Sequence, residues 1–129
     1  MKRSEKLEQI LLKVQKPGRY VGGELNAVVK NKTEVDTRFA FCFPDTYEIG
    51  MSHLGMKILY GELNEMPGVW CERVFAPWLD MEEQLRRNQL DLYALESGDS
   101  LRAVSYTHLD VYKRQAQRDG TAWKDCRKI

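Results

Sequence analysis

The sequence predicts an α/β fold organised around a partial Rossmann-like, doubly wound parallel sheet. Two short apolar runs, Arg38–Phe43 and Val69–Ala76, have the length and aromatic content of buried strands. Amphipathic stretches with helical spacing follow them, over Ser52–Met66 and Pro77–Asn88. Because a connection of this length crosses over a sheet, the strands are expected to be parallel, with right-handed crossovers.

Residues 1–37 are expected to form an N-terminal helix and an extended connector. The helix is predicted over Ser4–Gln15, and Pro17-Gly18 ends it. Its apolar positions recur with helical spacing: Leu7, Ile10, Leu11 and Val14. The connector, Arg19–Val35, contains a short apolar group and is predicted to hold one edge strand.

Residues 38–103 are expected to hold the sheet. The first strand should be buried on both faces, and Ser52 should cap the helix after it. The apolar stripe of that helix should face the sheet: Leu54, Ile58, Leu59, Leu63 and Met66. In the next helix Trp78, Met81 and Leu85 should point inward, and Asp91–Leu95 should form a third strand. Three strands are too few to cover a doubly wound sheet, so the domain is predicted to be incomplete.

Composition excludes several classes of function. The 129 residues suffice for one ordinary domain, and the net charge of +1 argues neither for a nucleic-acid partner nor for an acidic one, so no nucleic acid is predicted as a partner. No apolar run is long enough to span a bilayer, and the charged N-terminus is not a secretory signal. Three cysteines without a Cys-x-x-Cys pair predict a reducing, cytoplasmic setting.

The C-terminal stretch, residues 104–129, is predicted to be an unrelated and disordered tail. One codon choice for Ser105–Arg114 gives a string whose inner part is its own reverse complement, a property that selection on the protein does not produce. It resembles the translated junction of two sequencing adaptors. We therefore interpret Val104–Gln115 as an assembly scar and Ala116–Ile129 as translation of the DNA joined behind it; a natural strand and turn is the alternative.

The segment after the first predicted strand, Asp45–Gly55, is the candidate binding site. Ligands of open α/β sheets bind beyond the carboxyl ends of the strands, where helix N-termini offer free backbone amides. Seven residues of this segment are the candidate cofactor contacts: Tyr47, Glu48, Gly50, Met51, Ser52, His53 and Gly55. The segment lacks the glycine spacing of a dinucleotide loop and of a P-loop, so it indicates a crevice without naming a ligand.

Other reactive residues have simpler explanations. His53 in the first turn of a helix is more often a capping residue than a metal ligand, and Cys42 and Cys71 lie in predicted strands, where they act as small hydrophobic residues. Glu82-Glu83 suit the positive end of a helix dipole. No metal site and no catalytic group is therefore predicted.

Three stretches together resemble one protein family: Leu11–Tyr20, Phe39–Gly55 and Val69–Trp78. The most specific string is Phe-Pro-Asp-x-Tyr-Glu-Ile-Gly-Met-Ser-His-Leu-Gly, which begins at Phe43. The sequence is similar to the N-terminal region of large bacterial radical S-adenosylmethionine (SAM) proteins with a cobalamin-binding-type (B12-binding) domain. The resemblance runs from Lys6 to Arg102.

This resemblance implies a parent protein with a barrel whose Cys-x-x-x-Cys-x-x-Cys loop binds a [4Fe-4S] cluster and cleaves S-adenosylmethionine. The chain contains no such motif, so it should be inactive alone, with the barrel as its partner. It also lacks the Asp-x-His-x-x-Gly signature that ligates cobalt, because Met51 and Met56 stand where Asp and Gly are required. Cobalamin is thus possible in the parent, without a ligand from this loop.

The sequence leaves three functional hypotheses open. The first is a non-catalytic N-terminal fragment of a radical SAM protein. The second is a standalone Rossmann-like module that binds a nucleotide-like ligand in the Asp45–Gly55 crevice. The third, RNA binding by the basic tail, is disfavoured because no aromatic residues alternate with the basic run.

Overall fold

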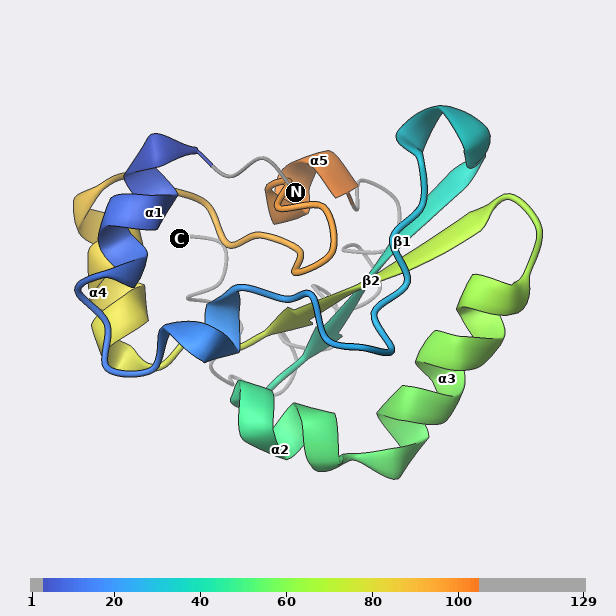
Figure 1. Ribbon diagram of the computed structural model, residues 1–129, viewed down its shortest axis with the longest axis horizontal. Helices are drawn as coiled ribbons and strands as arrows, with labels where there is room; N and C mark the ends of the chain where they lie inside the picture. Colours follow the sequence, from blue (N-terminus) through green and yellow to red (C-terminus); the bar gives the residue numbers. More distant parts are fainter. Residues whose placement is uncertain (1–3, 105–129) are drawn as a thin grey trace, which may run out of the picture.

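A parallel pair of strands, β1 (Thr37–Phe43) and β2 (Val69–Phe75), forms the sheet of the computed structural model, which describes residues 4–104 (Figure 1). The register is continuous, from Thr37 opposite Val69 to Phe43 opposite Phe75. Helix α3 (Leu54–Glu65) lies in the connection between the two strands and packs on β2. The predicted α/β class and parallel pairing are confirmed, and the arrangement is consistent with a partial Rossmann-like fold.

The N-terminal part consists of helix α1 (Glu5–Leu11) and two short 3-10 helices, η1 (Pro17–Tyr20) and η2 (Lys32–Glu34). Ser4 caps α1, because its Oγ accepts a hydrogen bond from the Leu7 amide at 3.3 Å. The predicted edge strand in the connector is wrong. Side chains satisfy the connector's backbone instead: the Tyr60 hydroxyl accepts from the Val28 amide, and Trp70 Nε1 donates to the Val28 carbonyl.

Strand β2 is more deeply buried than β1. Only Ala40 of the seven β1 residues is fully buried, so the prediction that this strand is covered on both faces is wrong. In β2 every residue after Val69 is buried. β2 is more buried because it has a neighbour along both of its edges. β1 pairs with one edge, and on the other edge the Leu95 amide donates to the Arg73 carbonyl.

Helix α3 faces the sheet with residues that the apolar pattern did not select. Its buried residues are Met56, Tyr60 and Asn64, and His53, not Ser52, is its N-cap. A separate short helix, α2 (Tyr47–Ser52), precedes it. Four residues of the predicted inward stripe are exposed: Leu54, Ile58, Leu59 and Met66. That prediction is wrong because hydrogen-bonding side chains occupy the sheet-facing positions.

Helix α4 (Leu79–Arg87) confirms its predicted inward residues Met81 and Leu85, both buried. The prediction that Trp78 points into the core is wrong, because this residue is 47% exposed and precedes the helix as its N-cap. Helix α5 (Leu101–Val104) ends the described part, and Val104 is buried in the core. The rest of the predicted tail, residues 105–129, lies outside the described residues.

The predicted third strand, Asp91–Leu95, is wrong. This segment turns back on itself at Gly98, whose φ of +75° suits glycine, and Tyr93 forms an antiparallel bridge with Ser100. One backbone hydrogen bond joins it to β2, from the Leu95 amide to the Arg73 carbonyl, at 2.9 Å. The side chain of Glu96 then accepts the Arg73 amide at 2.7 Å, where a strand would have used a backbone carbonyl.

The two faces of the sheet are covered differently. Ala40, Cys42 and Val74 face the larger core, which includes apolar residues of α1, α4 and α5. Phe41, Phe43 and Phe75 face a smaller cluster with α2 and α3. In Figure 1, α1 and α4 lie together at one end of the molecule, and α3 at the other. Arg73 of β2 lies on the α3 face, and Glu72 lies on the opposite face.

Candidate functional site

The predicted segment lies at the carboxyl edge of the sheet, as its place in the chain requires. There the Ala76 amide, just after β2, donates to the Asp45 carbonyl, just after β1, at 3.0 Å. This bond ties the ends of the two strands together. The residues that follow Asp45 form α2, where the sequence predicted a loop.

Helix α2 is fixed by close packing on Phe75. The Tyr47 ring lies edge-on to the Phe75 ring, with 5.5 Å between centroids. Gly50 contacts the same ring so closely that a Cβ there would lie 2.1 Å from Phe75 Cε1. Glycine is therefore required by this packing, and Gly50 offers no open backbone to a ligand.

The polar residues between the two helices stabilise the turn. His53 Nδ1 accepts the Met56 amide at 3.1 Å, and its ring lies 5.2 Å from that of Phe43. Ser52 Oγ donates to the Glu48 carbonyl at 2.7 Å, and Gly55 lies against the His53 ring. The capping role weighed for His53 is the one that the structure shows.

Glu48 is the exposed charged group of this edge. Its carboxylate accepts from Arg19 Nε at 2.7 Å and lies 3.9 Å from Lys16 Nζ. The hydrogen bond from Arg19 lowers the pKa of Glu48. Arg19 also lies over the Trp78 ring, 5.5 Å from its centroid, so its charge is already paired and stacked.

A buried ionic cluster around Arg73 was not predicted. Arg73 Nε donates to Glu96 Oε1 at 2.6 Å, and Nη2 to Glu24 Oε2 at 2.7 Å. Nη1 donates to Met51 Sδ, and the guanidinium lies 4.9 Å from the centroid of the Tyr60 ring. Each nitrogen of this cation therefore has a partner, and the cluster joins β2 to the connector, α2, α3 and the 92–96 segment.

The protonation of this cluster follows from burial and pairing. Burial acts to lower the pKa of Arg73, but Glu96 and Glu24 outweigh it and raise the pKa. For Glu24, burial acts upward, yet hydrogen bonds from Tyr47 and Arg73 lower its pKa. Burial, together with the bond to Glu24, raises the pKa of Tyr47 to about 12. At neutral pH Arg73 and Glu24 are therefore a charged pair.

A second ionic cluster lies on the opposite face of β2. Arg38 Nε and Nη2 both donate to Glu72 Oε2, at 2.9 and 2.6 Å, and its Nη1 donates to Asp99. Burial raises the pKa of Glu72 despite the bonds from Ser97 and Arg38. One signal could have located both clusters: Glu72-Arg73 is a charged pair inside an otherwise apolar strand, and a buried charge needs a partner.

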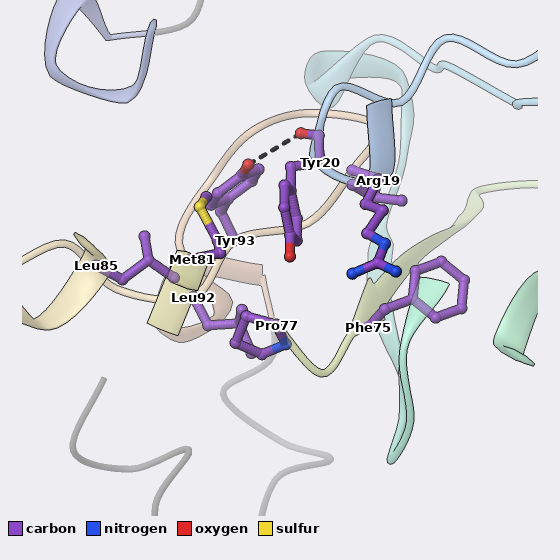
Figure 2. A pocket seen from close by; sticks show the side chains of 9 residues that line it. Arg19, Tyr20, Phe75, Pro77, Met81, Leu85, Leu92 and Tyr93 are labelled. Atoms are coloured by element: carbon purple, nitrogen blue, oxygen red, sulfur yellow. Dashed lines mark hydrogen bonds between the residues drawn. The ribbon is translucent and has the colours of Figure 1, made fainter. Parts of the chain in front are cut away.

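The cavity at this edge is small. It lies beside β2 and α4, has a volume of about 20 Å³, and is closed on one side by Tyr20 and Tyr93, whose hydroxyl donates to the Tyr20 carbonyl (Figure 2). Nine residues line it: Arg19, Tyr20, Phe75, Pro77, Met81, Leu85, Leu92, Tyr93 and Leu95. Space for about one water molecule does not admit a cofactor. None of the seven predicted contacts lines it, and their role toward a ligand stays a prediction.

The described residues do not fit an iron–sulfur cluster or a cobalt ligand. Within residues 4–104, no three His, Cys, Asp or Glu side chains are grouped to hold a metal. Burial, with Glu96 nearby, raises the pKa of Cys71 to about 12, which keeps this thiol protonated. His53 uses its Nδ1 as a helix cap. We therefore derive no step through either group from this chain.

Residues 55–113 match the family model described as radical SAM proteins, N-terminal. The match begins inside α3 and covers β2, α4 and α5, so it falls on the part of the chain that carries Arg73 and Glu96. It supports a radical SAM protein N-terminal region. Searches among curated proteins and among solved structures gave no match. In the stretch the structure describes, no helix is both long and apolar enough to cross a membrane.

Proposed function

We propose that this chain is a non-catalytic N-terminal region of a radical SAM protein, working in the cytoplasm. The observation that carries the proposal is the family match over residues 55–113. The resemblance of Phe43–Gly55 to the same family extends the argument toward the N-terminus. In this proposal the parent's barrel binds the [4Fe-4S] cluster and S-adenosylmethionine.

The internal pairing of the polar groups supports a structural role. A catalytic group normally points into a cleft and is free to meet a substrate. Here Arg73 donates to both Glu96 and Glu24, and Arg19 donates to Glu48. The carboxyl edge of the sheet is closed by the Asp45–Ala76 backbone bond and by α2. Such a region is suited to cover the barrel or to limit access to it.

The geometry of residues 4–104 gives cobalamin no support. The cavity is too small, and the imidazole of His53 is committed to the start of α3. We therefore propose no cobalt ligand here. The Asp45–Gly55 segment is kept as the part of the region that would border the parent's active site after docking. The standalone ligand-binding module is not favoured.

The test compares this chain with the polypeptide read from its source locus. After anaerobic reconstitution with iron and sulfide, we expect the longer polypeptide to show [4Fe-4S] absorbance and to release 5′-deoxyadenosine from S-adenosylmethionine. The 129-residue chain should do neither. Cluster binding and S-adenosylmethionine cleavage by the 129-residue chain, or a locus that encodes no cluster motif, would contradict the proposal.

A further inference from the structure

The side of α3 that faces away from the sheet is apolar and exposed. Leu54, Ile58, Leu59 and Met66 are 69, 54, 53 and 51% exposed. These side chains follow one another at helical spacing, and Met66 caps the helix C-terminus. A row of large apolar side chains on one helix is the usual mark of a surface that another element covers.

Two carboxylates lie within this row. Glu62 stands midway between Ile58 and Met66, four residues from each, and Glu65 stands three residues after Glu62. Within residues 4–104, neither Glu62 nor Glu65 has an ion pair or a side-chain hydrogen bond. We call Leu54, Ile58, Leu59, Glu62, Glu65 and Met66 the α3 outer face.

The fold itself does not explain the α3 outer face. The buried residues of the helix, Met56, Tyr60 and Asn64, lie on its opposite side. Tyr60 and Asn64 lock the rotation of the helix, because Asn64 bonds both the amide and the carbonyl of Cys71. The helix therefore cannot turn its leucines inward without breaking buried hydrogen bonds.

The size of the face indicates what kind of occupant it takes. Four such side chains, each about half exposed, present on the order of 300 Å² of apolar surface. A stable complex of separate chains buries about 800 Å² per partner, so this face alone is too small to hold a dimer. Contacts between domains of one polypeptide are smaller, because the linkage raises their effective concentration.

We propose that the α3 outer face docks this region onto the cluster-bearing part of the same polypeptide. The inference rests on the proposed function and specifies which surface makes the contact. The occupant is an apolar patch that carries at least one Lys or Arg side chain, placed to meet Glu62 and Glu65. The apolar row supplies the burial, and the two carboxylates fix the orientation of docking.

Carbene footprinting of the longer polypeptide tests this proposal. We expect several-fold weaker labelling of the α3 outer face than of Leu12 and Leu25, which are 87 and 100% exposed and serve as internal references. Ile58→Glu should restore labelling of Leu59 and Met66 without loss of cluster absorbance. The matched control is Leu12→Glu, which places the same charge at the C-terminal end of α1, the helix that packs on α4. It should leave the labelling of the α3 outer face unchanged.

The possible failures are distinguishable. If a polypeptide that binds its cluster shows the α3 outer face labelled as strongly as the references, the docking inference is overturned and the proposed function stands. If the 129-residue chain is a dimer that Ile58→Glu converts to monomers, the occupant is a second copy, which also overturns the inference. A polypeptide without a cluster overturns the proposed function, and the inference falls with it.

Discussion

The two faces of the sheet are stabilised by different interactions. On the α1 and α4 face, Val74, Met81 and Leu85 belong to a large, continuous apolar core, and the ion pair of Arg38 with Glu72 lies beside it. On the α3 face the apolar cluster is small, and its buried residues are Met56, Phe75 and Leu95. Around this cluster lie four buried residues whose polar groups are hydrogen-bonded: Tyr60, Asn64, Arg73 and Glu96.

This difference explains why the apolar pattern of the sequence predicts the buried side of α4 correctly and that of α3 wrongly. In α4 the apolar residues are buried because they pack against apolar side chains on that face of the sheet. In α3 two hydrogen-bonding residues take the inward positions, because the buried groups of β2 would otherwise lack partners. The packing of α3 is thus more dependent on single hydrogen-bonding residues than the packing of α4, and substitutions should show this.

The largest effect is expected for Glu96→Ala. This carboxylate is fully buried and accepts from the Arg73 side chain, the Arg73 amide and the Tyr60 hydroxyl. Its removal leaves Arg73 Nε, the Arg73 amide and the Tyr60 hydroxyl as buried donors without this acceptor, which costs about 4 kcal/mol in the free energy of unfolding. Urea denaturation measures it. Glu82→Ala, at an exposed helical pair with Arg86, is the control and should cost less than about 0.5 kcal/mol.

A somewhat smaller effect is expected for Leu85→Ala on the apolar face. Leu85 is fully buried in the α1 and α4 core, and truncation leaves a cavity that its neighbours fill only in part. We expect a loss of about 3 kcal/mol in the free energy of unfolding, against almost none for the exposed Leu79→Ala on the same helix. Equal losses for the two leucines would show that α4 does not pack as described.

The sequence predicts the elements that depend on local pattern and apolar burial. The parallel strands, the crossover helix and the inward residues Met81 and Leu85 are confirmed. The third strand failed because its backbone partner is replaced by a side chain, Glu96, and by a turn at Gly98. Neither a side chain that replaces a backbone partner nor a turn produces a periodic apolar pattern in the sequence.

The site shows the same division. Sequence reasoning located Tyr47–Gly55 at the carboxyl edge of the sheet, because strand order alone determines that place. It did not find Glu24 and Glu96, which lie far from Arg73 in sequence and meet it only after folding. Charged residues in a connector and after a presumed strand look solvated until a buried partner is identified.

A pH dependence should test the ionic cluster around Arg73 on the α3 face. The pKa of Glu24 is lowered from its ordinary value of 4.5, so its contribution to stability is complete above that pH and is lost as the pH falls through the folded-state value. Glu24→Gln should therefore flatten the fall in unfolding free energy below pH 4.5. At neutral pH it should cost about 1 kcal/mol, because the amide oxygen still accepts a bond from Arg73.

Thermal or urea unfolding between about pH 3 and 7, the range that includes the titration of carboxyl groups, provides the measurement for Glu24→Gln. The control is Glu62→Gln, which removes a carboxyl that has no ion pair within residues 4–104. A profile as steep for Glu24→Gln as for the unmodified chain would mean that the Arg73 cluster does not hold Glu24 charged.

The smallest effect is expected on the α3 outer face itself. Ile58 is more than half exposed, so Ile58→Ser removes little buried area from this chain and should change its unfolding free energy by less than about 0.5 kcal/mol. Met56→Ser, two residues away on the buried side, should cost about 3 kcal/mol. If Ile58→Ser costs as much as Met56→Ser, α3 does not pack with Met56 buried and Ile58 exposed as described. A near-zero cost for Ile58→Ser instead leaves this apolar row without a stabilising role in the region itself, which is the property that a docking surface must have.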